Sequence, residues 1–132
     1  MTPPSRDAPD RLPLRRGQVV VARFDPAEGA EQSKTRPAII VSNDGANAAA
    51  VRVGYGTITV IPLTGTVDPA GRPRPYHAEV DPAEAGLRRV STAQAEHIRS
   101  LAVSRIDRIV GRLDPVAMAR VDAAIRVHLS LD

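Results

Sequence analysis

Short apolar runs separated by polar, proline- and glycine-rich segments cover most of this 132-residue chain. Residues 18–24 (QVVVARF) and 37–42 (PAIIVS) are rich in Val and Ile, and residues 56–64 (GTITVIPLT) alternate between polar and apolar positions. Runs of this length and composition favour extended strands. The pattern therefore predicts strands in these three segments, followed by shorter strands at 76–80, 88–93, 98–103 and 109–113.

The segments between the strands are interpreted as turns and loops. Residues 43–54 combine turn-forming residues with a short alanine run, and Gly54-Tyr55-Gly56 is interpreted as a hairpin turn. Residues 81–86 form another predicted turn. Pro62 lies near the end of the third predicted strand, and because proline has no amide hydrogen it predicts a sheet edge or a bulge.

A helical pattern appears at the C-terminal end. Asp114-Pro115 predicts a helix start, since aspartate caps helices well and proline suits the first helical position. Apolar residues then recur at helical spacing, namely Val116, Met118, Val121, Ile125 and Leu129. Short strands followed by one amphipathic helix predict a mainly β fold, in the form of a small, partly open barrel.

Composition and charge exclude some classes of function for this chain and leave others open. Cysteine is absent, so the chain has no disulfide framework and no thiolate metal site. No apolar stretch is long enough to span a membrane or to form a signal peptide, so the expected location is the cytoplasm. The net charge of +3 is a mild bias toward polyanions. Lys34 is the single lysine among 18 basic residues; genomic composition and phosphate recognition by arginine explain this equally well.

Aromatic residues are scarce, with only Phe24, Tyr55 and Tyr76 in the chain. This argues against RNA binding on an aromatic sheet surface. Residues 1–14 hold four prolines and alternating charges, which predicts a flexible N-terminal arm before a single domain at 15–132.

The run Lys34-Thr35-Arg36-Pro37 leads directly into the second predicted strand. Pro37 biases the preceding residues toward extended geometry, so the Arg36 guanidinium would stand at the mouth of a sheet, where it could grip a phosphate with two hydrogen bonds. The surrounding string EGAEQSKTRPAIIVSND and the later Pro62-Leu63-Thr64 resemble the MazF/PemK-like toxins, small ribonucleases of toxin–antitoxin pairs. The resemblance covers about residues 15 to 131 and implies an SH3-like (CcdB/PemK-type) barrel, usually dimeric.

This resemblance implies a sequence-specific, metal-independent endoribonuclease. The 2′-hydroxyl of single-stranded RNA attacks the neighbouring phosphorus, leaving a 2′,3′-cyclic phosphate and a 5′-hydroxyl, and no cofactor is required. It also implies that Arg36 and Thr64 form the catalytic pair. Glu31 is a possible general base, although a salt bridge to Lys34 accounts for it equally well. Further residues implied in RNA binding are Gln32, Lys34, Thr35 and Pro62. The implied partners are the RNA substrate, a MazE-like antitoxin and a second copy of the chain.

Two other functions stay open at this point. A barrel of this size could be a binding module that holds RNA or protein without chemistry. It could also be a CcdB-like toxin that poisons DNA gyrase, but such proteins depend on a C-terminal tryptophan and this chain has none. His77, His97 and His128 lack metal-ligand spacing. His97 stands where many MazF-like sequences carry glutamine, so any role of that glutamine does not transfer.

Overall fold

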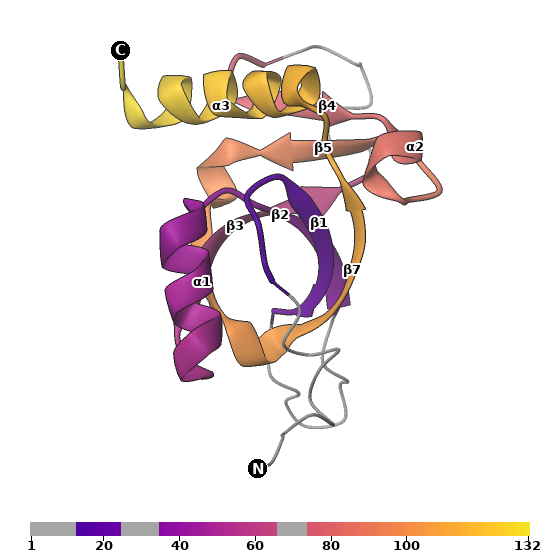
Figure 1. Cartoon of the computed structure of the whole chain (residues 1–132). Coiled ribbons are helices and arrows are strands. Elements are labelled where there is room, and N and C mark those ends of the chain that lie inside the picture. The colour runs from indigo at the N-terminus through magenta and orange to yellow at the C-terminus, as the bar shows by residue number, and fades with distance from the viewer. Residues whose placement is uncertain (1–12, 25–34, 66–73) are drawn as a thin grey trace, which may run out of the picture.

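The computed structural model describes residues 13–24, 35–65 and 74–132 (Figure 1). The strands are β1 (Gln18–Arg23), β2 (Thr35–Ile40), β3 (Thr57–Thr64), β4 (His77–Val80), β5 (Ser91–Gln94), β6 (Arg99–Ala102) and β7 (Ile106–Arg112). The helices are α1 (Asp44–Val53), α2 (Pro82–Ala85) and α3 (Pro115–Leu129), with 3₁₀ turns η2 (Ala95–His97) and η3 (Val103–Arg105). All seven predicted strands and the terminal helix are therefore confirmed, with ends shifted by a few residues.

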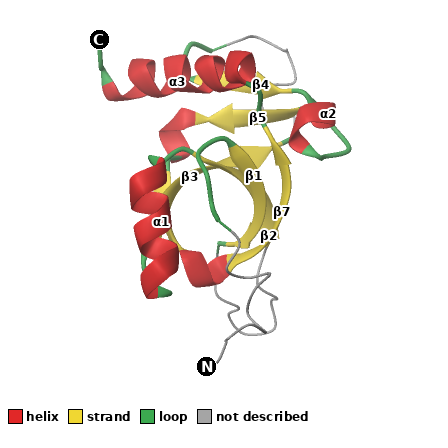
Figure 2. Ribbon diagram, viewed as in Figure 1, coloured by secondary structure: helices red, strands yellow, loops and turns green. Residues whose placement is uncertain are grey.

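The strands form one antiparallel sheet in the order β4-β5-β3-β2-β1-β7, and β6 pairs with β3 beside β5. Strands β1, β2, β3 and β7 curve around a ring, α1 lies against one side of it, and α3 crosses β4 and β5 at one end (Figures 1 and 2). The predicted fold, a mainly β, incompletely closed barrel with a C-terminal helix, is confirmed.

Both faces of the central strands are buried. On one face, Val20, Ile40 and Val60 fill the inside of the barrel. Their chain neighbours point the other way into a second core that α3 covers, and that core includes Val19, Ile39, Ile61, Met118 and Val121. Strands buried on both faces need apolar residues at consecutive positions. This explains why the Val- and Ile-rich runs at 18–24 and 37–42 are nearly continuous.

Two predicted turn segments are wrong, because their turn-forming residues are helix caps. The Asn43 side chain accepts a hydrogen bond of 2.8 Å from the Ala46 amide, and Gly54 ends α1 with a left-handed φ of 84°. Gly54-Tyr55-Gly56 therefore joins α1 to β3 and is not a hairpin. The segment 81–86 likewise contains α2, capped by Asp81 and Gly86. In the described part of the chain, no helix is long and apolar enough to cross a membrane.

Of the two alternatives predicted for Pro62, a sheet edge or a bulge, the sheet edge is wrong, because β3 is central. On one side β3 pairs with β2, with Pro62 opposite Ala38. On its other side it pairs first with β6, through residues 57–60, and then with β5, through residues 63–64. Pro62 lies in the gap between these two partners, so on that side no neighbouring strand needs a hydrogen bond at this position.

The expected N-terminal arm lies almost entirely outside the described residues. Only Pro13 and Leu14 of its 14 residues are described, and Leu14 is buried against the barrel interior.

Candidate active site

The register of β2 and β3 puts Arg36 and Thr64 just beyond the same end of this strand pair. Ile39 lies opposite Ile61 and Ala38 opposite Pro62 in this antiparallel pair. Ala38 and Pro62 are the last pair of this ladder. Two residues beyond them lie Arg36 on β2 and Thr64 on β3. Side chains two residues apart on a strand share a face, so both lie on the face of Ala38 and Pro62. Arg36 is exposed there and Thr64 is half-buried.

Polar side chains continue across the sheet from this pair. Thr64 pairs with Thr92 on β5, and Thr92 pairs with Glu79 on the edge strand β4. Gln94 lies two residues from Thr92 on β5 and therefore on the same face, and it pairs with His77 on β4. These positions share one side of the sheet, the side opposite α3. We call this surface the polar face; it consists of Arg36, Thr64, Thr92, Glu79, Gln94 and His77.

Glu96, in η2, is bonded to two members of the polar face. Its Oε2 atom lies 3.0 Å from His77 Nε2 and 3.5 Å from Gln94 Nε2. The His77 side chain is only 10% exposed and the Glu96 side chain 29%. Burial alone would raise the pKa of the Glu96 carboxyl, but the hydrogen bonds from His77 and the backbone and the nearby His97 lower it below its ordinary value of 4.5. Glu96 is therefore ionised at neutral pH.

A second guanidinium lies beside the polar face. Arg99 pairs with Val60 on β3, two residues before Pro62 on the same face. Its guanidinium carbon is 5.3 Å from the centre of the Phe24 ring, within the range of a cation–π contact. Arg36 on β2 and Arg99 on β6 thus add two positive charges from the strands on either side of β3, a favourable arrangement for a polyanion.

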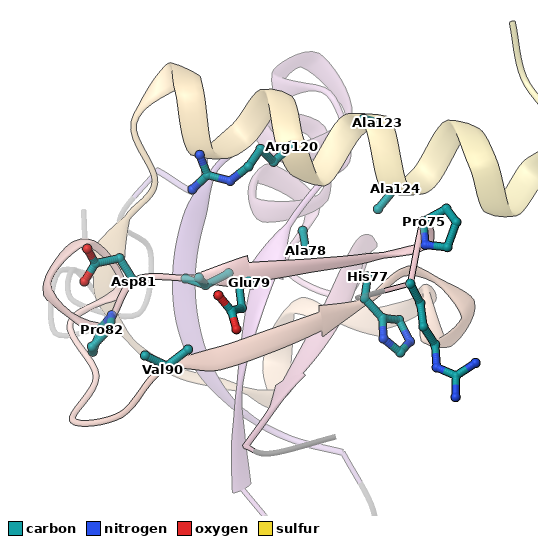
Figure 3. A pocket seen from close by; sticks show the side chains of 12 residues that line it. Pro75, His77, Ala78, Glu79, Asp81, Pro82, Val90, Arg120, Ala123 and Ala124 are labelled. Carbon is teal, nitrogen blue, oxygen red and sulfur yellow. The ribbon is translucent and has the colours of Figure 1, made fainter. Parts of the chain in front are cut away.

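A groove of about 830 Å³ runs along the outer edge of β4, between this strand and α3. Figure 3 shows Arg120 of α3 on the α3 side of this edge, while the His77 and Glu79 side chains point to the side of β4 away from α3. Both basic and acidic side chains line the groove, among them Arg120 and Asp81. Through His77 and Glu79 it adjoins the polar face.

The remaining predicted site residues fall into two groups. Glu31, Gln32 and Lys34 lie outside the described residues. Thr35 is exposed at the start of β2, opposite Arg23, and Pro62 is half-buried in the middle of the polar face.

No sequence motif marks Thr92, Gln94 or the His77–Glu96 pair as site residues. The alternation of Ser91-Thr92-Ala93-Gln94 marks two polar side chains on one face of a strand, but the sequence has no signal that β5 lies beside Thr64.

The histidines lie on different elements, as their spacing predicts: His77 on β4, His97 on η2 and His128 on α3. Across residues 13–24, 35–65 and 74–132, no three His, Cys, Asp or Glu side chains come close enough together to hold a metal ion.

Comparison with known proteins identifies the class that this fold and polar face define. Residues 15–129 match the family model of PemK-like, MazF-like toxins of type II toxin–antitoxin systems, so the chain belongs to this family. Over 118 residues it is 41% identical to Endoribonuclease MazF9 of Mycobacterium tuberculosis, a match that covers 89% of this chain and 98% of that protein.

Two solved structures share the architecture. The Mycobacterium tuberculosis toxin MazF-mt6 is 25% identical with a TM-score of 0.67, covering 87% of this chain and 98% of the toxin. A chain of the MazE–MazF crystal structure from Deinococcus radiodurans is 25% identical with a TM-score of 0.68, covering 91% of this chain and 98% of that one.

Proposed function

We propose that this chain is the toxin of a type II toxin–antitoxin pair and cleaves single-stranded RNA at specific sequences, without a metal ion, on the polar face. The chain is an endoribonuclease of the MazF-like family, and the proposal concerns how and where it cuts. The observation that supports it is the register of β2 and β3: their last pair is Ala38 opposite Pro62, and Arg36 and Thr64 each lie two residues beyond that pair.

The chemistry follows from the substrate. The ribose 2′-oxygen forms a bond to phosphorus while the bond from phosphorus to the 5′-oxygen breaks, so the products are a 2′,3′-cyclic phosphate and a 5′-hydroxyl. A general base must remove the proton of the 2′-hydroxyl, and the departing 5′-oxygen must gain one. Negative charge grows on the phosphoryl oxygens between these events, and donors fixed in place before the reaction stabilise it best.

Arg36 and Thr64 take these stabilising roles. The Arg36 guanidinium remains charged at neutral pH and can donate two parallel hydrogen bonds to a phosphate. The Thr64 hydroxyl adds a third donor, held in place by the pairing of β3 with β5. Glu31 is the proposed general base, and we assign Gln32, Lys34, Thr35 and Pro62 to RNA binding around the same end of β2 and β3.

The proposed partners follow from the family. Solved relatives include a complex of MazE with MazF, and we propose that a short antitoxin covers the polar face with an extended segment. A homodimer would widen the concave surface that one chain of this size offers, and residues 15–132 would form each subunit's domain. Because the proposed substrate is cellular RNA, we propose that the protein acts in the cytoplasm.

Replacement of Arg36 tests the proposed site. The purified protein should cut single-stranded RNA in EDTA, and Arg36→Ala should lower the cleavage rate by at least about 10²-fold, the usual effect of removing a charge-stabilising donor. Arg108→Ala is the matched control, because Arg108 is also an exposed strand arginine but pairs with Val21, one position out of phase with the polar face. Wild-type activity in Arg36→Ala, with the fold intact by circular dichroism, would show that the site is elsewhere.

A substrate lacking the nucleophile tests the mechanism separately. RNA with a single 2′-deoxy sugar at the scissile nucleotide should bind the protein and stay whole, whereas its all-ribose counterpart is cut. A binding module without chemistry would leave both RNAs intact. Cleavage of the deoxy substrate would exclude attack by the ribose.

A further inference from the structure

We propose that Gln94 reads one base of the RNA next to the scissile phosphate, and that Glu96 and His77 are positioning residues that fix the orientation of its amide. This inference rests on the proposed function, because it takes the polar face as the RNA-binding surface. It assigns a role to the cluster of titratable and amide groups that the proposed cleavage step leaves unused.

The position of Gln94 follows from the strand register. Gln94 lies on β5 two residues from Thr92 and on the same face, one residue beyond Ala93, which pairs with Leu63. Thr92, also on that face, pairs directly with Thr64. A nucleotide whose phosphate lies at Arg36 and Thr64 therefore has Gln94 one step away along the sheet, within the span of a ribose and its base.

The orientation of the Gln94 amide is set by charge. An ionised carboxylate can only accept hydrogen bonds, and Glu96 is ionised because its pKa is lowered. The amide nitrogen of Gln94 must therefore be the atom that faces Glu96 Oε2, at 3.5 Å. This leaves one N–H group and the carbonyl oxygen of Gln94 for another partner. A donor and an acceptor side by side match the edge of an unpaired base.

The neighbouring residues hold this arrangement in place. His77 donates to the same Glu96 oxygen at 3.0 Å, and its ring contacts the Tyr76 ring edge-on at 4.7 Å between centres. His77 and Gln94 face each other on paired strands, and the backbone of Ala95, just after Gln94, is hydrogen-bonded to Tyr76 at 3.0 Å. A recognition group supported by packed neighbours on strands discriminates better than one on a mobile loop.

Deep sequencing of the 5′ ends released from a randomised single-stranded RNA pool tests the role of Gln94. Gln94→Leu keeps nearly the same volume and removes both hydrogen-bonding groups. It should reduce the base preference at one position by about 10-fold or more, the usual effect of losing a bidentate contact to a base. The other positions should keep their preference. Gln18→Leu changes the half-buried glutamine of β1, away from the polar face, and should leave every position unchanged.

The roles of Glu96 and His77 must be tested with a measurement that a change in fold stability alone does not affect. In Glu96→Gln the charge that orients Gln94 is gone, so the same single position should lose preference, with the others retained. His77→Phe should have a weaker effect at that same position. An unchanged preference in Gln94→Leu overturns the proposal. Loss of cleavage at all sequences by folded Gln94→Leu also overturns it, because the residue would then act in the reaction itself.

Binding of uncleavable RNA separates this inference from the proposed chemistry. Oligonucleotides with a 2′-deoxy scissile sugar, differing only in the neighbouring base, should bind wild-type protein with different affinities and Gln94→Leu with equal ones, measured by fluorescence anisotropy. If wild-type protein cuts no RNA but keeps this Gln94-dependent discrimination, the proposed chemistry fails and the reading role stands. If it shows no discrimination, the reading role fails.

Discussion

Single polar side chains add hydrogen bonds and ion pairs between elements that the hydrophobic core also joins. Arg16, just before β1, forms a two-pronged ion pair with Asp122 of α3 and donates from Nε to the Val41 carbonyl at 2.9 Å. Its backbone amide donates to Asp44 Oδ1 at 2.7 Å. One residue thus links β1, the end of β2, α1 and α3. A bidentate pair of this kind needs the guanidinium fork, which lysine lacks.

Asn47 is the completely buried polar residue of α1, and its replacement tests the junction of this helix with β3. Its side-chain amide donates to the Ser42 carbonyl at 2.9 Å, and its oxygen accepts from the Ser42 hydroxyl, which in turn accepts from the Thr59 amide at 3.0 Å. Asn47→Ala leaves these buried groups without partners, so the free energy of unfolding should fall by about 2 kcal/mol.

Urea denaturation would measure the effect of Asn47→Ala. Arg52→Ala, exposed on the same helix, is the control and should change stability by less than about 0.5 kcal/mol. Equal effects of the two replacements would mean that the Ser42–Asn47–Thr59 network contributes nothing to stability.

Glu84 has the opposite pH behaviour from most carboxylates in folded proteins. Burial raises the pKa of Glu84 above its ordinary value of 4.5, and the adjacent Asp114 and Asp81 add to the increase. The folded state therefore holds the proton more tightly than the unfolded state, and stability falls as the pH rises through the folded pKa. Glu84→Gln should melt at a higher temperature than wild type at pH 7.

At pH 4 and below, wild-type Glu84 is largely protonated in both states, so the two proteins should melt nearly together. Thermal melts at both pH values check this. The same difference at pH 4 and pH 7 would show that packing, and not charge, causes it.

At the scale of elements, two glycines allow α2 to pack on β7. A Cβ atom on Gly86 would overlap the Val110 carbonyl oxygen and lie 2.8 Å from the carbonyl carbon, and one on Gly111 would overlap the Ala85 carbonyl group. Gly86 also has a φ of 68°, in the left-handed region that favours glycine. The contact between this one-turn helix and the edge strand therefore depends on the absence of side chains at both positions.

A comparison of two helix-ending glycines separates the clash from the backbone cost. Gly54→Ala also forces alanine into a left-handed conformation, at φ 84°, but its Cβ would meet nothing within 4 Å. It should cost about 1 kcal/mol, whereas Gly86→Ala should cost about 2 kcal/mol more, because α2 must move away from β7. Chemical denaturation gives both values. Equal costs would mean that α2 moves away from β7 without loss of stability.

The elements that sequence analysis predicted well are those whose signal is local. Strand segments and the capped terminal helix depend on neighbouring residues, and the structure has them. Helix α1 was missed because Asn43 and Gly54 are as common in turns as in caps, and the Ala48–Ala50 run between them lacks a clear apolar stripe. The central position of Pro62 has no local signal. It arises because β3 pairs first with β6 and then with β5, and these strands are distant from it in sequence.

At the scale of the whole molecule, the candidate-site residues also fall into two groups, those with a local sequence signal and those without one. Arg36 and Thr64 could be named from two short motifs because a family resemblance carries them. Thr92, Gln94, His77 and Glu96 could not, since only long-range register brings β4 and β5 beside Thr64. The proposed recognition of a base depends on this second group.

The switch of partners along β3 also determines which changes this toxin can tolerate. Pro62 and Thr64 face the proposed RNA surface and Val60 faces the barrel interior, while 61 and 63 face the core under α3. Substitutions at individual positions preserve this alternation, but insertion or deletion of one residue between Thr57 and Thr64 would turn Leu63 outward and bury the threonine. Length variation should therefore be excluded from β3 and concentrated in the loops.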